Sequence, residues 1–209
     1  SVLPVKSSEN KLLVTADHGE MLGDRHAWGK MTPHAAAWHT PLIVRDPENP
    51  GAHGTRVDAP TESIDIAPTL LSWIGQAVPP SMDGHALQPF LTGAPPTDWR
   101  RHSYAELDFG NPVEPTEWQA ALGLTASEAN MSILRGPDHT LAHFNGGLPP
   151  LLFATSDTTP KVNLASDPAY ATLLLQMTQT LLSHRMTHAD HTLSATQITP
   201  DGPVTAPRR

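Results

Sequence analysis

The chain has 209 residues, no cysteine, a formal net charge of −8 and 38% hydrophobic residues. That length allows one sizeable core, or one main unit with a small satellite. Without cysteine there are no disulfide or thiolate sites. An acidic chain that lacks a lysine and arginine cluster argues against nucleic acid or an anionic membrane surface as partners. We find neither a signal-peptide pattern nor an apolar run of about twenty residues, so we expect no membrane span and slightly favour a cytoplasmic location.

The first half of the chain alternates short apolar runs with loops. Leu12–Thr15 reads as a buried strand, and residues 41–45 form a second, β-branched run that predicts another strand. Residues 19–39 lie between them without a helical or strand period, so we predict a loop there. Ser63–Ile74 is predicted to be a helix that ends at Gly75. Its apolar positions share one face: Ile66, Leu70, Trp73 and Ile74.

The second half has a different character. Four short runs separated by turn residues indicate a small antiparallel sheet: Ser103–Phe109, 130–134, 140–144 and 151–153. Asp167-Pro168 then opens the best-defined helix, because Asp is a favoured N-cap and Pro a favoured first residue. The apolar stripe of this helix is expected to pack on the small sheet. The stripe consists of Tyr170, Leu173, Leu174, Met177 and Leu181.

The most informative stretch is Asp17-His18-Gly19-Glu20, which follows the first apolar run. Ligands bind at the carboxyl ends of strands in open α/β sheets, and a carboxylate beside an imidazole suits a divalent cation. Gly19 allows the backbone to turn, and Lys30 supplies a cation for an anionic substrate. In the competing interpretation Asp17 caps a turn, His18 is solvated and Lys30 is an ordinary surface lysine. Asp24 is interpreted as a turn residue.

Two blocks of motifs resemble the C-terminal half of the sulfatase family in the alkaline-phosphatase superfamily. The first block contains Thr15-Ala16-Asp17-His18-Gly19-Glu20, Leu22-Gly23-Asp24, Gly29-Lys30 and Pro41-Leu42-Ile43-Val44. The second contains Asp65-Ile66-Ala67-Pro68-Thr69-Leu70-Leu71, Asp83-Gly84 and Leu91-Thr92-Gly93. Later segments are similar to the phosphonate monoester hydrolase and phosphodiesterase branch: Leu148-Pro149-Pro150-Leu151-Leu152-Phe153, Lys161-Val162-Asn163-Leu164-Ala165 and Arg185-Met186-Thr187-His188-Ala189-Asp190.

The resemblance implies an α/β fold: part of an alkaline-phosphatase-like sandwich, with a small C-terminal antiparallel sheet and a packed terminal helix. It divides the chain into the C-terminal portion of a catalytic domain (1–100), a sheet-plus-helix subdomain (101–195) and a flexible tail (196–209). The implied activity is metal-dependent hydrolysis of sulfate, phosphate or phosphonate esters. The partner is then a small anionic ester, and the proline-rich loops make a homo-oligomer possible.

The resemblance also implies roles for individual residues. Asp17 and His18 match a pair of ligands for a divalent metal, Mn²⁺ or Ca²⁺, and Lys30 matches a lysine that contacts the substrate anion. Asp65 is interpreted as structural, satisfying backbone donors at a helix start.

The family's nucleophile is commonly a formylglycine in a C/S-x-P-x-R motif near the N-terminus, and this chain contains no such motif there. The T-x-P-x-R pattern at residues 205–209 is interpreted as chance. We therefore expect a C-terminal portion of a longer enzyme, which lacks the nucleophile. The alternative is a non-catalytic remnant or binding module that retains half of the sulfatase fold.

Overall fold

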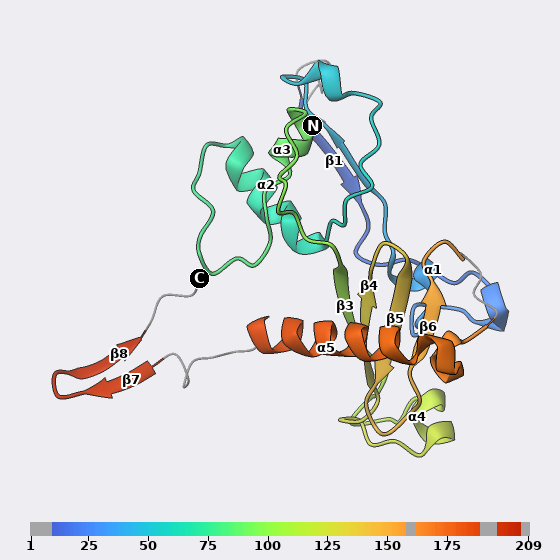
Figure 1. Ribbon diagram of the computed structural model, residues 1–209. Helices are drawn as coiled ribbons and strands as arrows, with labels where there is room; N and C mark the ends of the chain where they lie inside the picture. The colour runs from blue at the N-terminus through green and yellow to red at the C-terminus, as the bar shows by residue number, and fades with distance from the viewer. Residues whose placement is uncertain (1–9, 158–161, 189–195, 206–209) are drawn as a thin grey trace.

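A computed structural model describes residues 10–157, 162–188 and 196–205 of the chain. Figure 1 shows a four-stranded sheet with one long helix lying across it, and an N-terminal part with short strands and helices beside the sheet. The expected mixed α/β class, with a small antiparallel sheet and a packed terminal helix, is confirmed. No helix within the described ranges has the length and apolar character that crossing a bilayer requires.

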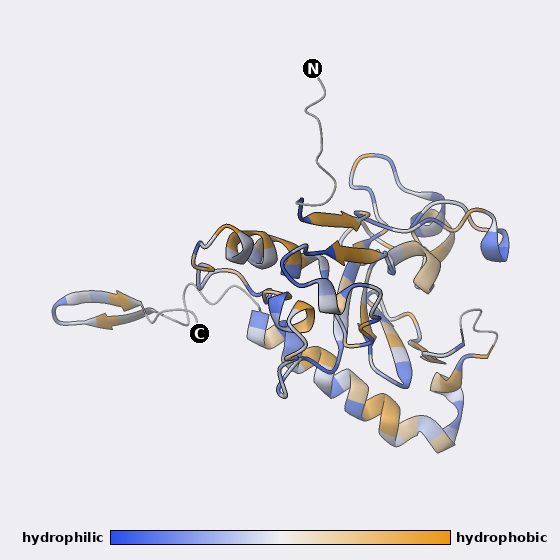
Figure 2. Ribbon diagram, turned by 90° about the horizontal axis from the view of Figure 1, so that it is seen from above, coloured by the Kyte–Doolittle hydropathy of each residue, from blue (hydrophilic) through white to orange (hydrophobic). Residues whose placement is uncertain are grey.

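The first two strands form an antiparallel ribbon. β1 (Leu12–Thr15) pairs with β2 (Leu42–Arg45), and Val14 stands opposite Ile43. Both strands lie where the sequence predicts them, but the prediction that β1 is buried is wrong, because Leu12 is 50% exposed and Val14 45% exposed. Figure 2 shows both strands in orange, the colour of apolar residues. Nothing in the described part of the chain covers the face that carries Leu12, Val14 and Ile43.

The predicted loop between these strands contains two short elements that the sequence does not predict. A 3-10 turn spans Asp24–His26, and α1 spans Ala35–Trp38. The segment after β2 adds a further 3-10 turn at Pro50–Ala52. These elements are too short to produce a readable hydrophobic period, which explains why the sequence indicates only a loop.

The predicted helix over residues 63–74 is present as a 3-10 turn, Ser63–Asp65, followed by α2 (Ile66–Trp73). Its buried side differs from the expected one, because Leu70 and Ile74 are exposed whereas Asp65 and Thr69 are buried. Polar contacts explain this orientation. Thr69 Oγ1 donates to Asp65 O at 2.7 Å and accepts from the backbone N–H of Leu87 at 3.0 Å, just before α3 (Gln88–Leu91).

The C-terminal sheet has the order β3-β4-β5-β6, and every neighbouring pair is antiparallel. α4 (Glu117–Leu122) lies in the connection between β3 and β4, and Thr116 caps it by accepting from the backbone N–H of Gln119. The four strands fall where the sequence predicts them. Their bounds are Ser103–Asp108, Asn130–Arg135, His139–Phe144 and Leu151–Ala154.

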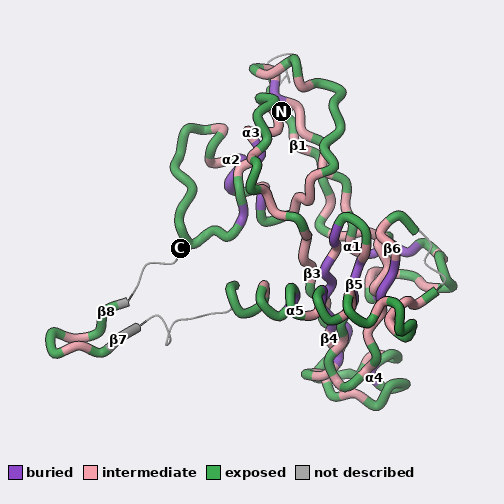
Figure 3. Tube along the Cα trace, in the orientation of Figure 1, coloured by how far each residue is buried: buried purple, intermediate pink, exposed green. Residues whose placement is uncertain are grey.

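The main core lies between this sheet and α5 (Ala171–His188). Two 3-10 turns precede the helix, Leu164–Ser166 and Pro168–Tyr170, and the Asp167 carboxylate accepts from the backbone N–H of Ala169, as its N-cap position predicts. Figure 3 shows the buried stretches on β4, β5 and β6 behind α5. The predicted stripe is confirmed: Met177 and Leu181 are buried against Leu134, Leu141 and Leu152, with Tyr170, Leu173 and Leu174 packed around them.

The segment expected to be a flexible tail contains a hairpin. β7 (Thr196–Thr199) and β8 (Gly202–Thr205) pair antiparallel, and Figure 1 shows them away from the four-stranded sheet. Parts of three sequence motifs lie outside the described residues. They are residue 161 of the 161–165 motif, residues 189–190 of the 185–190 motif, and most of the T-x-P-x-R pattern at 205–209.

Candidate functional site

One cavity brings together the three residues that the sequence singles out. Its volume is about 1370 Å³, and Asp17, His18 and Lys30 all line it. One wall consists of the segments around the first two strands, and the other consists of β3 and the end of β4. The cavity therefore lies between the N-terminal part of the chain and the C-terminal sheet.

Asp17 and His18 are held in a defined mutual arrangement. The His18 backbone N–H donates to Asp17 Oδ1 at 3.0 Å, and His18 Nδ1 lies 2.7 Å from Gly19 O. A carbonyl oxygen can only accept, so this contact assigns the donor role to Nδ1, and in the neutral imidazole the lone pair then lies on Nε2. His18 Nε2 lies 3.5 Å from Asp17 Oδ2. Metal-binding histidines are oriented in this way, with one ring nitrogen fixed by a carbonyl and the other free for the ion.

The donor chemistry of this pair fits a divalent cation but does not complete a site. The Asp17 side chain is 88% exposed and His18 is 36% exposed, so both are accessible to an ion. No group of three or more His, Cys, Asp or Glu side chains in the described ranges is placed to hold a metal ion. Since a cation takes about four to eight donors, the pair supplies part of a coordination sphere.

Gly19 has a role that differs from the expected one. Its backbone N–H donates to Ala37 O at 2.9 Å, and a Cβ added to Gly19 would lie 2.0 Å from Ala36 O. The residue is therefore required for close packing of α1 against the Asp17–His18 segment, and not for a left-handed turn.

Replacing Gly19 by Ala is expected to destabilise the chain by about 1–3 kcal/mol, because the added methyl group overpacks this contact. The measurement is urea unfolding of the 209-residue chain. Gly51→Ala is the matched control, since a Cβ there meets nothing within 4 Å. Equal midpoints for the two variants would show that α1 shifts without cost and that the close approach is unimportant.

The loop that carries Lys30 is fixed by backbone contacts. Glu20 Oε1 accepts from the Gly29 N–H at 2.5 Å, and Lys30 O accepts from the Thr32 N–H at 2.8 Å. The Lys30 side chain is half-buried. It forms no ion pair with a carboxylate in the described ranges, so its ammonium group is available to an anion in the cavity.

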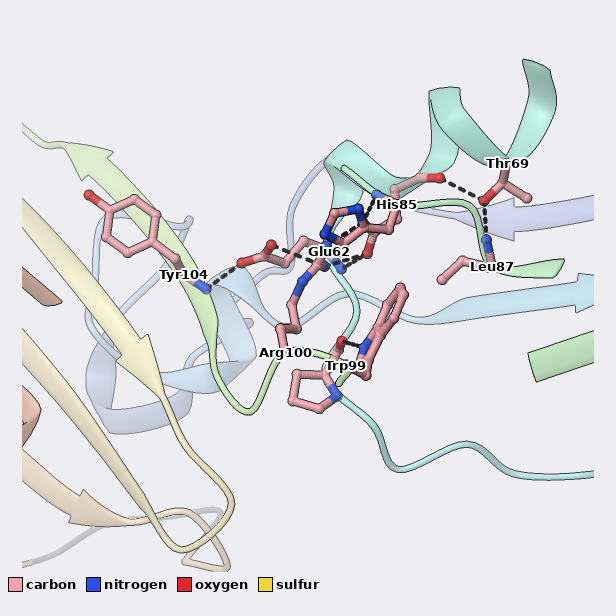
Figure 4. Close-up of polar contacts among 9 residues, drawn as sticks. Glu62, Thr69, His85, Leu87, Trp99, Arg100 and Tyr104 are labelled. Carbon is pink, nitrogen blue, oxygen red and sulfur yellow. Dashed lines mark hydrogen bonds and ion pairs between the residues drawn. The ribbon is translucent and has the colours of Figure 1, made fainter. Parts of the chain in front are cut away.

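A buried ionic cluster forms the adjoining wall of the cavity (Figure 4). Arg100 Nη1 and Nη2 donate to the two oxygens of Asp65 at 2.5 and 2.7 Å, and Arg100 Nη1 lies 3.1 Å from Glu62 Oε2. Asp65 also accepts from the backbone N–H groups of Glu62 and His85, at 2.9 and 2.8 Å. The Asp65 side chain is fully buried. Its predicted structural role is confirmed.

Glu62 connects this cluster to the C-terminal sheet. Its Oε1 accepts from the Tyr104 backbone N–H at 2.6 Å, at the start of β3. Burial raises the pKa of Glu62, and this effect exceeds the opposing effects of the Tyr104 N–H and of Arg100. The Tyr104 hydroxyl donates to Glu106, and burial together with that carboxylate raises the pKa of Tyr104 to about 12. Both residues line the cavity with Arg100.

A histidine and an arginine on the cavity wall are also affected by burial. Burial lowers the pKa of His39, and the nearby charge of Arg135 lowers it further, which keeps the imidazole neutral near pH 7. Burial also lowers the pKa of Arg135. Sequence reasoning did not identify Arg100 or Arg135, because their partners are distant in sequence: 35 positions separate Arg100 from Asp65.

Comparisons with known proteins show which proteins the chain is similar to. Residues 23–114 match the family model described as N-sulphoglucosamine sulphohydrolase, C-terminal. The multifunctional alkaline phosphatase superfamily protein PehA of Trinickia caryophylli is 36% identical over 195 residues, which cover 93% of this chain and 38% of that protein.

Solved structures are similar over almost the whole chain. The phosphonate monoester hydrolase of Silicibacter pomeroyi has a TM-score of 0.82 and 48% identity, with 97% of this chain and 40% of that one covered. The corresponding enzyme of Agrobacterium radiobacter has a TM-score of 0.81 and 37% identity, with 95% and 39% covered. The chain thus spans about two fifths of the length of these relatives. Residues 23–114 thus match a sulfatase C-terminal region, and the chain as a whole is similar to a protein of the alkaline phosphatase superfamily and to phosphonate monoester hydrolases.

Proposed function

We propose that this chain supplies a pair of metal ligands and a substrate-binding lysine to a hydrolase of sulfate, phosphate or phosphonate esters. The observation that carries the proposal is the presence of Asp17, His18 and Lys30 in one cavity. The imidazole of His18 beside the Asp17 carboxylate favours Mn²⁺, which accepts nitrogen as well as oxygen ligands, and Ca²⁺, which prefers oxygen ligands, is the alternative.

The chemistry of these groups suits an anionic ester. A divalent cation, when bound, polarises the S–O or P–O bonds and stabilises developing negative charge. Asp17 and His18 would hold that ion, and the ammonium group of Lys30 would neutralise charge on the transferred group or on the leaving oxygen. Such preorganised electrostatics is where enzymes of this kind gain most of their rate.

The relatives support the substrate class. The two similar solved structures are named as phosphonate monoester hydrolases, and another solved relative, BT4656, is a complex with its substrate D-glucosamine-2-N,6-O-disulfate. We infer a small anionic ester as the substrate of the protein to which these residues belong. The described residues include no C/S-x-P-x-R motif, so a formylglycine nucleophile would come from outside them.

The test is an assay of the full-length product of the gene that encodes these residues. It uses an aryl sulfate, a phosphate diester and an aryl phosphonate monoester, each with Mn²⁺ or Ca²⁺ and after chelation. We expect turnover of at least one ester and its loss on chelation. Absence of turnover with all three esters would favour the alternative, a non-catalytic remnant of the fold.

In the same assay, Lys30→Ala is expected to lower kcat by about 10²-fold, the usual effect of removing one group that stabilises transition-state charge. Metal content should stay the same, because Lys30 is a cation and no ligand. Plasma mass spectrometry of the dialysed protein measures the metal, and initial rates measure kcat. Unchanged kinetics on every ester would remove Lys30 from the proposed site.

A further inference from the structure

Arg135 is the last residue of β4 and lines the cavity that holds Asp17, His18 and Lys30. Its guanidinium carbon lies 5.9 Å from the centroid of the Trp38 ring. Trp38 ends α1, and its Nε1 donates to Pro33 O at 3.0 Å, which fixes the ring. The arginine is thus placed against a fixed aromatic surface on the cavity wall.

Two other arginines that line this cavity form ion pairs with carboxylates. Arg100 is paired with Asp65 and Glu62, and Arg56 Nε lies 2.8 Å from Asp58 Oδ1. Arg135 is half-buried, yet among the residues that the structure describes no carboxylate pairs with it and no acceptor meets its N–H groups. None of its nitrogens is among the fully buried atoms without a partner, so its N–H groups stay accessible and can donate to an acceptor on a ligand.

In the proposed function, Lys30 faces the ester group that is cleaved. Arg135 is an additional positive charge in the same cavity. Its fork of N–H donors matches a planar carboxylate with two parallel hydrogen bonds. A carboxylate carries one negative charge, which the single positive charge of the guanidinium balances.

We propose that Arg135 binds a carboxylate on the organic part of the substrate, and so selects esters that carry a second negative charge. This inference rests on the proposed hydrolase function, because that function places the ester at Asp17, His18 and Lys30. Arg135 is then a specificity-determining residue: it touches the substrate away from the bond that is cleaved.

The experiment compares ligands that differ only in the carboxylate. Phenylphosphonic acid is compared with its meta- and para-carboxylated forms by calorimetric titration of the full-length gene product in Mn²⁺. The ester that is turned over best in the assay above is compared with its carboxylated analogue in kinetics. For at least one isomer we expect binding about tenfold tighter and a KM lowered by a similar factor with kcat unchanged, the usual effect of charge-assisted hydrogen bonds.

Three variants test whether this preference belongs to Arg135. Arg135→Gln should abolish it and leave the binding of phenylphosphonate unchanged, and Arg135→Lys should retain part of it, because charge remains but the planar fork is lost. Arg101→Gln removes an exposed arginine from the same cavity lining and should change the preference by less than about twofold, because its charge is screened by water and salt.

The outcomes separate the two proposals. Turnover without any preference for the carboxylated ligand overturns the inference and leaves the hydrolase standing. A preference for carboxylated ligands without turnover of any ester overturns the hydrolase and the selection of esters with it, and supports only the binding of a carboxylate by Arg135. If Arg135→Gln and Arg135→Lys both weaken phenylphosphonate as much as its carboxylated forms and lower the melting temperature, Arg135 pairs with a protein group instead, and the inference fails.

Discussion

Asp17→Asn and His18→Ala are each expected to lower metal affinity and turnover together in the full-length gene product. Partners that merely orient a metal-binding histidine are worth about 10–100-fold in metal affinity, so removing a ligand itself should cost more than about 100-fold. Turnover should fall with metal occupancy and recover in part when the metal concentration is raised. Equilibrium dialysis with Mn²⁺ or Ca²⁺ measures the affinity, and initial rates over a metal titration measure the recovery.

The matched control is Asp24→Asn, which changes an exposed carboxylate on the same loop. Its metal affinity and rates should equal those of the unchanged protein. Lys30→Ala provides the contrast, with a lowered rate at full metal occupancy. If both Asp17→Asn and His18→Ala retain their metal, the ion lies elsewhere and these residues are not its ligands.

Arg100→Met is expected to destabilise the 209-residue chain by about 3–5 kcal/mol, because it leaves two carboxylates of the buried cluster without their counter-charge. Arg100 makes the ion pairs to Asp65 and Glu62 and also stacks over Trp99, with its guanidinium carbon 5.0 Å from the ring centroid. Methionine keeps much of the side-chain volume, so the lost charge dominates. Chemical unfolding at pH 7 is the measurement.

The destabilisation by Arg100→Met should depend on pH, and the raised pKa of Glu62 determines the direction of that dependence. The pKa of Glu62 is raised in the folded chain, so protonation of this residue favours folding, and that contribution is lost as the pH rises through the raised pKa. Loss of Arg100 raises this pKa further, because the cation that favours the charged form is gone. The destabilisation by Arg100→Met should therefore shrink as the pH is lowered from 7 toward 4.

Arg101→Met serves as the control for this prediction, since it removes an exposed arginine at the next position and should change stability by less than about 0.5 kcal/mol. The stability of Arg100→Lys should lie between those of Arg100→Met and Arg101→Met, because lysine restores the charge without the bidentate hydrogen bond to Asp65. Similar stabilities for Arg100→Met and Arg101→Met would show that the buried carboxylates do not depend on this ion pair.

Much of the fold could be predicted because its patterns are local. The strands β4, β5 and β6 are apolar runs between turn residues, and α5 follows an Asp-Pro start with a regular stripe. The buried side of α2 could not be predicted in this way. Asp65 and Thr69 face inward because Arg100 and Leu87 meet them from 35 and 18 positions away, and no local pattern records such partners.

The residues of the candidate site likewise differ in whether the sequence alone could identify them. Asp17 and His18 are adjacent in sequence and Lys30 follows on the next loop, so all three could be proposed as a set; their roles stay predictions. Arg135 enters the cavity only because β4 lies beside β3 and the Trp38 ring reaches it. Such a contact depends on tertiary structure, and sequence patterns do not contain it.

The open face of the β1–β2 ribbon has a practical consequence. Leu12, Val14 and Ile43 present apolar surface to water on a ribbon in which, within the described residues, each strand has one strand partner. Such ribbons associate with other chains unless something shields them. Preparations of these 209 residues by themselves should therefore self-associate as they are concentrated, and mild detergent or an added charge at position 43 should keep them dispersed.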